Sequence, residues 1–232
     1  MSVAKSQRNF LRSLRTGIVL LGLLTLLSSF AAAQADVIRR TYVWSYSGKT
    51  WSFSYDFPAN LYQFQKSLPR TLDYTAYAAY VDDPREQTVL QDFVTKLEAS
   101  ALGLPLWDRL NLVIALVQSI PYAEEPCEYP RYPIEMLVDQ QGDCEDSAIL
   151  AAALVRKLGF DAVLLAFLEE HHMAIGIRVL PPALKDSQFY AWNGDLYYYL
   201  EPTSPGWAIG QVPPAYQSVP EVIGLSSLYA TP

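Results

Sequence analysis

The feature of this chain that most constrains its fold is an alanine-rich run, Ser147–Leu154, that directly follows the block Gly142–Asp146 (GDCED). Aspartate is favoured at helix N-caps, as at Asp143, and alanine has the highest helix propensity. The helix should end at about Leu158, because the next residue is a glycine that can terminate it. One face carries only small apolar side chains: Cys144, Ala148, Ala151, Ala152 and Val155. The sequence therefore predicts a buried helix that a neighbouring element approaches closely.

Cys144 would lie in the first turn of this helix. A thiol at a helix N-terminus is close to the positive end of the helix dipole, which lowers its pKa and favours the thiolate. The carboxylates of Asp143, Glu145 and Asp146 act in the opposite direction. An imidazolium partner would therefore be needed for a reactive thiolate. Cys144 is either a nucleophile or a small buried residue, and this block alone does not separate the two interpretations.

The candidates for that partner are the chain's two histidines, His171 and His172. The alternating stretch from His172 to Leu180 predicts a strand, with His172, Ala174 and Gly176 on one face. We expect this small-residue face to pack on the alanine face of the helix, which selects His172 over His171.

The third candidate is Glu201, at the end of a predicted strand and directly before Pro202. It shares a strand face with Tyr197 and Tyr199. A carboxylate in this place can hold an imidazole in one tautomer and stabilise its protonated form. The alternative is a glutamate that faces water.

Outside this region the patterns predict mixed secondary structure. We expect an aromatic hairpin over residues 39–55, helices from about residue 85 and over 107–119, and a loop over 122–136. Strands are expected over 162–167, 189–192 and 196–200, and an Asn-Gly turn joins the last two of these. Helices followed by antiparallel strands imply an α+β fold. The expected organisation is a targeting segment over 1–35, the hairpin and an irregular connection after Pro58 over 36–84, and a main domain over 85–232.

Residues 1–35 resemble a signal peptide, with a basic start, an apolar stretch and the small-residue site Ala33–Ala35. An uncleaved membrane anchor is the alternative, because the apolar stretch approaches the length of about 20 residues that spans a bilayer. Without the four basic residues of this segment, 13 Lys+Arg remain against 24 Asp+Glu, a net charge of −11. Such a chain repels nucleic acid. We expect a secreted or periplasmic protein, with membrane contact only through the N-terminal segment.

Cys127, the other cysteine, offers three alternatives. It is inert, it forms a reversible disulfide with Cys144 that blocks the thiol, or it forms a structural disulfide, as oxidising compartments favour. A zinc site from both cysteines and both histidines is disfavoured, because adjacent residues of a strand point to opposite faces. No metal and no cofactor is expected.

The ordered cysteine, histidine and carboxylate segments taken together resemble the transglutaminase-like superfamily, in particular its prokaryotic branch, which includes cysteine proteinases. The resemblance covers roughly residues 117–210 and rests on four segments: Tyr132–Leu137, Gly142–Asp146, His172–Gly176 and Leu200–Thr203. It implies a papain-like α+β core with the nucleophile at a helix N-terminus. It also implies Cys144 as nucleophile, His172 as base and Glu201 as the orienting carboxylate, where the family more often has aspartate.

The implied reaction is acyl transfer from a protein or peptide amide, as in a cysteine peptidase, a deamidase or a transglutaminase. The backbone N–H of Cys144 and a donor from Gln118 or Tyr122 are candidates for the oxyanion hole. An acceptor cleft lined by aromatic residues is one interpretation of Trp192, Tyr197, Tyr199 and Trp207; burial in the core is the other. A non-catalytic binding or scaffold domain is the alternative function.

Overall fold

The computed structural model describes residues 36–179 and 187–226. Its N-terminal element is a hairpin of β1 (Val37–Tyr46) and β2 (Lys49–Pro58), paired along their full length. The connecting residues Ser47 and Gly48 have φ of 52° and 71°, as a two-residue turn between twisted strands requires. The inner face of the hairpin buries aromatic side chains against Phe93, so the hairpin shares its hydrophobic core with the helices that follow.

Helices occupy most of the chain between the hairpin and the second sheet. They are α2 (Ala59–Lys66), the 3-10 turn η2 (Tyr74–Ala76), α3 (Ala78–Val81), α4 (Gln87–Ser100), α5 (Leu106–Gln118), α6 (Pro133–Asp139) and α7 (Cys144–Lys157). The predicted irregular connection after Pro58 is therefore wrong, since α2 and α3 lie there. The predicted loop over 122–136 is also wrong in its last part. Pro133 stands at the first position of α6, where its missing N–H has no helical partner to lose.

The second sheet has five antiparallel strands in the order β5-β6-β4-β3-β7. Their bounds are β3 (Asp161–Phe167), β4 (His172–Arg178), β5 (Phe189–Trp192), β6 (Asp195–Leu200) and β7 (Glu221–Gly224). Strand β7 was not expected from the sequence. The predicted α+β fold, with a helix carrying Cys144 at its N-terminus and packed on an antiparallel sheet, is confirmed.

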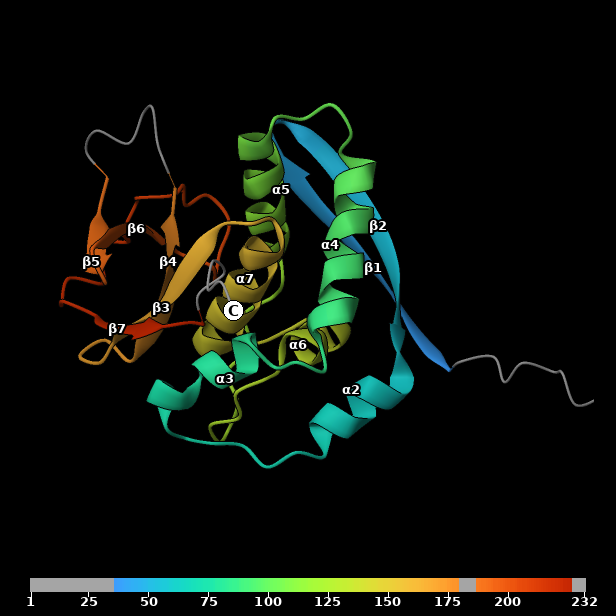
Figure 1. The fold of residues 1–232 in the computed structure, drawn as a ribbon, viewed down its shortest axis with the longest axis horizontal. Coiled ribbons are helices and arrows are strands. Elements are labelled where there is room, and N and C mark those ends of the chain that lie inside the picture. The colour runs from blue at the N-terminus through green and yellow to red at the C-terminus, as the bar shows by residue number, and fades with distance from the viewer. Residues whose placement is uncertain (1–35, 180–186, 227–232) are drawn as a thin grey trace, which may run out of the picture. The chain divides into compact units, whose positions relative to one another are not determined.

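Helix α7 is the central element of the domain. In Figure 1 it lies between the five-stranded sheet and the helices α4 and α5. Its alanines are buried, together with Ile149, Leu150 and Leu154. It ends as predicted, with Gly159 at φ 88° two residues beyond Lys157. Because α7 contacts elements on both sides, it fixes the position of its N-terminal turn relative to the sheet.

The sheet packs on α7 with the opposite face from the one predicted. The side chains of Met173, Ile175 and Ile177 join the core that contains α7. Ala174 lies in a second, smaller core on the far face, with Val163, Tyr197 and Tyr199. The expectation that the small-residue face of β4 packs on α7 is therefore wrong. Gly176 is small for a different reason: a Cβ there would lie 2.8 Å from Cβ of Tyr197 on β6.

The predicted targeting segment, residues 1–35, lies outside the described residues. Across the described part of the chain, no helix combines the length and the apolar character needed to cross a bilayer.

Candidate active site

The block Gly142–Asp146 forms the N-terminus of α7, with Asp143 as its N-cap. Asp146, at the third helical position, accepts a hydrogen bond from the backbone N–H of Asp143 at 3.4 Å. Gly142 has no room for a side chain, because a Cβ there would lie 2.7 Å from Oδ2 of Asp146. The capping residues and the glycine together place Cys144 at the first helical position.

Arg131 holds this N-terminus from outside the helix. Its guanidinium forms ion pairs with Asp146 and Glu125, and its backbone N–H donates to Asp146 Oδ1 at 2.6 Å. The side chains of Arg131 and Asp146 are 8% and 0% exposed. A buried carboxylate without such a partner would be strongly destabilising. This pair therefore fixes the first turn of α7 against the segment before α6.

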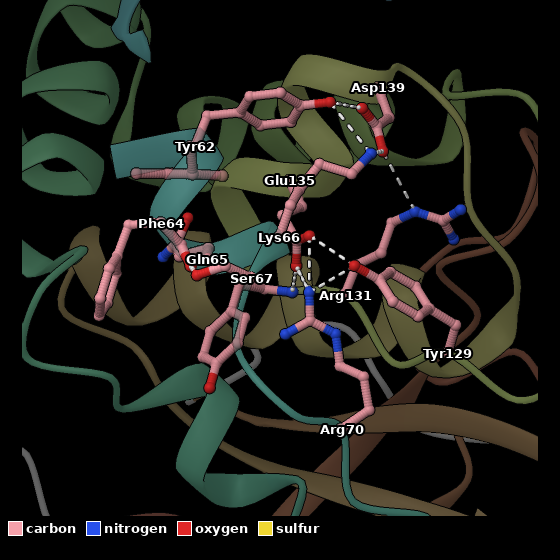
Figure 2. Close-up of polar contacts among 12 residues, drawn as sticks. Tyr62, Phe64, Gln65, Lys66, Ser67, Arg70, Tyr129, Arg131, Glu135 and Asp139 are labelled. Atoms are coloured by element: carbon pink, nitrogen blue, oxygen red, sulfur yellow. Dashed lines mark hydrogen bonds and ion pairs between the residues drawn. The ribbon is translucent and has the colours of Figure 1, made fainter. Parts of the chain in front are cut away.

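A second arginine network supports the same segment on its other side. Figure 2 shows Arg70 and Tyr129 pointing at the carboxylate of Glu135 on α6. Arg70 Nη2 donates to both oxygens of Glu135 at 2.7 Å, and the Tyr129 hydroxyl donates to Oε1 at 3.0 Å. The guanidinium of Arg70 also lies 4.4 Å from the ring centroid of Tyr129. The loop between α5 and α6 is thus anchored by buried charges rather than by a disulfide.

The thiol of Cys144 is surrounded by groups that disfavour its ionisation. It donates to Oε2 of Glu145 at 3.3 Å. Burial, and then the negative charge of Glu145, raise the pKa of the Cys144 thiol well above its usual range. The backbone N–H of Met173 acts in the opposite direction but does not outweigh them. The thiol is therefore protonated at neutral pH.

Three carboxylates gather beside this thiol. Oxygens of Glu125, Asp143 and Glu145 all lie within 4.8 Å of one another. Burial raises the pKa of Asp143 to about 8, and the adjacent Glu145 adds to this effect. Burial likewise raises the pKa of Glu125 and of Glu145 to about 7. Partial protonation therefore limits the negative charge that this cluster carries at neutral pH.

His172 begins β4 and is hydrogen-bonded to Glu201, which directly follows β6. Nε2 of His172 lies 2.9 Å from Oε2 of Glu201, and the two side chains are 6% and 1% exposed. Since the carboxylate accepts the proton of Nε2, the neutral imidazole has its lone pair on Nδ1. His171, by contrast, is exposed and has a left-handed backbone conformation, with φ of 50°.

Glu201 is held by more than the histidine. The hydroxyl of Tyr199 donates to Oε2 at 2.7 Å, and the backbone N–H and hydroxyl of Thr203 donate to Oε1 at 3.0 and 2.6 Å. Burial raises the pKa of Glu201, but the contact with His172 and these hydrogen bonds outweigh it, so its pKa is lowered. Glu201 is therefore an ionised, fixed acceptor for the imidazole.

Cys144 and His172 line one cleft of about 380 Å³ at the N-terminus of α7 and the turn between β3 and β4. One wall comes from the segment between α2 and α3, with Leu72, Tyr74 and Tyr77. The other comes from the turn between β3 and β4, with Leu168. The structure thus brings the thiol and the imidazole to the same surface hollow, and Glu201 lies behind the imidazole.

Other residues singled out in the sequence are placed elsewhere. Both cysteines are free thiols, and Cys127 is exposed, so the disulfide alternative is not formed here. The Gln118 amide donates to the backbone carbonyls of Glu201 and Trp207 at 2.8 and 3.0 Å, which commits it to the fold rather than to an oxyanion. Tyr122 is half exposed and bridges to Gly142, beside Cys144.

None of the aromatic residues proposed for an acceptor cleft lines the cleft of Cys144: three belong to or pack against the core, and Trp207 is half-buried and lines other surface hollows. Tyr197 and Tyr199 are buried in the smaller core, and Trp192 packs against it. The sequence did not indicate a role for three other residues that support the site: Arg70, Arg131 and Tyr216. Their partners are distant in the chain; the ring of Tyr216, for example, contacts His172.

No protein-family model and no curated protein matches this chain. Among solved structures, calcium-bound LapG from Legionella pneumophila is similar at 18% identity and a TM-score of 0.36, over 71% of this chain and 80% of that chain. A putative cysteine protease from Cytophaga hutchinsonii is similar at 14% identity and a TM-score of 0.37, over 82% of this chain and 73% of that chain. Likeness at this level assigns neither a family nor a function.

Proposed function

We propose that this protein catalyses thiol-dependent acyl transfer on protein or peptide amides, with Cys144 as nucleophile, His172 as general base and Glu201 as the carboxylate that orients His172. The observation that carries the proposal is the buried pair of His172 and Glu201, 2.9 Å apart, with His172 lining the same cleft as the thiol of Cys144. A buried histidine–carboxylate pair beside a helix-N-terminal thiol has the parts that nucleophilic catalysis needs.

The raised pKa of Cys144 determines how the first step proceeds. Because the thiol is protonated at neutral pH, its proton passes to Nδ1 of His172 as sulfur attacks the amide carbonyl carbon. The imidazolium, stabilised by Glu201, then gives this proton to the leaving amine as the C–N bond breaks. Water or a second amine attacks the resulting thioester, which releases the acyl group and returns the proton to the thiol.

The substrate in this proposal is a protein or peptide amide, either a peptide bond or a glutamine side chain. The cleft is open at the surface, and two apolar side chains of its lining, Leu72 and Leu168, are 68% and 50% exposed. A surface hollow with exposed apolar residues suits an extended segment of another chain. The place of action in this proposal is outside the cytoplasm, in accordance with the signal-like sequence of residues 1–35.

Labelling with iodoacetamide tests the chemistry. In reduced, folded protein we expect His172→Ala to slow labelling of Cys144 at neutral pH by at least about 100-fold, the range that a catalytic base supplies. His171→Ala is the matched control and should leave the rate unchanged. The exposed thiol of Cys127 is an internal reference in every variant. Equal labelling of Cys144 in both histidine variants would refute the assignment of His172 as base.

A second experiment separates the possible acceptors. The protein is incubated with a glutamine-rich protein and a fluorescent primary amine, and the products are analysed by mass spectrometry. Amine incorporation identifies cross-linking activity, conversion of glutamine to glutamate identifies deamidation, and shorter peptides identify a peptidase. Each activity must disappear in Cys144→Ser.

The alternative is a binding domain that keeps this fold without the chemistry. One observation favours it: the thiol of Cys144 is bonded to a carboxylate that holds it in its unreactive form. In that case Cys144 in reduced, folded protein would be no more reactive than an ordinary buried thiol, with or without His172.

A further inference from the structure

The ring of Tyr216 lies flat against the imidazole of His172. The two ring centroids are 3.8 Å apart and the planes differ by 5°. Tyr216 belongs to the segment between β6 and β7, which forms no regular secondary structure, and it packs against the smaller core on the far face of the sheet. Phe167 contacts both rings, at 6.3 Å from His172 and 6.0 Å from Tyr216. One face of the imidazole is therefore covered by an aromatic ring.

Hydrogen bonds to the carboxylate of Glu170 hold the segment that carries Tyr216. Glu170, in the turn between β3 and β4, accepts hydrogen bonds from the backbone N–H groups of Gln217 and Ser218 at 2.9 and 2.8 Å, and from the Ser218 hydroxyl. Glu170 precedes His172 by two residues, and Gln217 directly follows Tyr216. The turn that presents the imidazole and the segment that covers it are thus fixed to each other.

We propose that Tyr216 is a positioning residue for His172, and that Glu170 acts with it by anchoring the Tyr216 segment to the turn before β4. This inference rests on the proposed function, since it assigns Tyr216 a part in directing the imidazole of His172 toward Cys144. A hydrogen bond to Glu201 fixes the position of Nε2 but leaves the ring free to tilt about that bond. A flat contact at 3.8 Å removes this tilt.

The stacked ring also keeps water from one face of the His172–Glu201 hydrogen bond. A hydrogen bond shielded from water is stronger than an exposed one, because no solvent molecule competes for its donor or acceptor. The hydroxyl of Tyr216 is not needed for either effect. The contribution should therefore belong to the ring, so Tyr216→Phe should retain it and Tyr216→Leu should lose it.

Proton NMR of the imidazole rings tests the contact itself. The chain has two histidines, so the spectrum has a simple assignment, and exposed His171 is an internal reference. We expect the ring protons of His172 to be shifted upfield by the tyrosine ring in the wild type and in Tyr216→Phe. In Tyr216→Leu this shift should be lost while the signals of His171 stay in place. Unshifted His172 signals in the wild type would overturn the proposal.

Iodoacetamide labelling of Cys144 tests the consequence. Tyr216→Leu should slow the labelling that depends on His172 by about 10-fold, as expected for a modest misplacement of a catalytic group, whereas Tyr216→Phe should stay within about twofold of the wild type. A Tyr216→Leu variant that loses the ring shift but labels at the wild-type rate would overturn the positioning role. An equal loss in Tyr216→Phe would also overturn it, because the hydroxyl would then be responsible.

Variants of the anchor test the position of the Tyr216 segment without changing Tyr216 itself. Glu170→Ala should reduce both the upfield shift of His172 and the labelling rate, and Glu170→Gln, which keeps an acceptor oxygen, should retain more of each. The matched control is Glu169→Ala, at the exposed neighbouring residue. If Glu170→Ala behaves like Glu169→Ala, the anchor has no such role. Wild-type labelling that does not depend on His172 would refute the proposed function instead, and the NMR comparison would still report on the stack.

Discussion

The thiol of Cys144 donates a hydrogen bond to Oε2 of Glu145, the next residue in the chain, at 3.3 Å. A helix N-terminus favours a thiolate, but here burial and this carboxylate reverse the effect and raise the pKa of the thiol. The resting state that follows is a protonated thiol rather than a preformed thiolate–imidazolium pair. Glu145 therefore lowers the fraction of Cys144 that is present as the nucleophilic thiolate.

Replacing Glu145 by Gln should make the thiol of Cys144 more reactive. The amide has no negative charge, so the pKa of Cys144 should fall, and each unit of that fall raises the thiolate fraction tenfold at a fixed pH below the pKa. We expect labelling of Cys144 at neutral pH to accelerate by about 10-fold, and the rise of the rate with pH to begin at lower pH. Glu128→Gln is the matched control, since Glu128 lines the same cleft but bonds to the Tyr77 hydroxyl. A slower rate in Glu145→Gln would contradict this account.

Shortening the carboxylate of Glu201 should uncouple it from His172. Glu201→Asp keeps the charge but withdraws the oxygens by one methylene from a contact that is now 2.9 Å long. We expect labelling of Cys144 to fall by about 10- to 100-fold, because small misplacements of catalytic groups have effects of this size. Glu221→Asp, at an exposed glutamate that bonds to the Tyr74 hydroxyl, should leave the rate unchanged.

The carboxylate of Glu201 should make the free energy of unfolding fall at acidic pH. Its pKa in the folded protein is below the ordinary value of 4.5, so its stabilisation is present above about pH 4.5 and is lost as the pH falls through the folded value. Urea unfolding should show that the free energy of unfolding of Glu201→Gln falls less between about pH 5 and pH 3 than that of the wild type. Parallel pH profiles for the two proteins would contradict the lowered pKa.

Removing Arg131 should destabilise the fold through the first turn of α7. Arg131→Met leaves the buried carboxylate of Asp146 without its cation, and breaking such a pair costs about 3–5 kcal/mol. Arg39→Met is the control, because Arg39 and Asp56 form an exposed pair with side chains 72% and 40% exposed. That exposed pair is screened by solvent, so its loss should change the free energy of unfolding far less than the loss of Arg131. Urea unfolding at pH 7 measures both, and equal losses would show that Arg131 has no special role.

Local sequence signals predicted the elements that depend on neighbouring residues. The cap at Asp143 and the alanine run predicted α7, and the Asn-Gly turn predicted the β5–β6 hairpin. The packing of β4 could not be predicted in this way. Both faces of β4 are buried, so alternation could not tell which face meets α7, and small size at Gly176 reflects the close approach of Tyr197 rather than of a helix. Contacts such as those of Arg131 with Asp146 and of Tyr216 with His172 depend on the tertiary fold.

Substitutions at Gly142 and Gly176 should separate an effect on the stability of the fold from an effect on the reactivity of Cys144. A Cβ at Gly142 would lie 2.7 Å from Oδ2 of Asp146, and a Cβ at Gly176 would lie 2.8 Å from Cβ of Tyr197. Each substitution by Ala should therefore destabilise the protein by about 1–3 kcal/mol, the usual cost of overpacking. Gly142→Ala should in addition change the labelling rate of Cys144, because Asp146 must move and it fixes the turn that carries the thiol. Gly176→Ala, in the core on the far face of the sheet, should unfold at lower urea concentration yet label at the wild-type rate below its transition. Equal labelling rates in the two variants would show that the N-terminal turn of α7 tolerates displacement of Asp146.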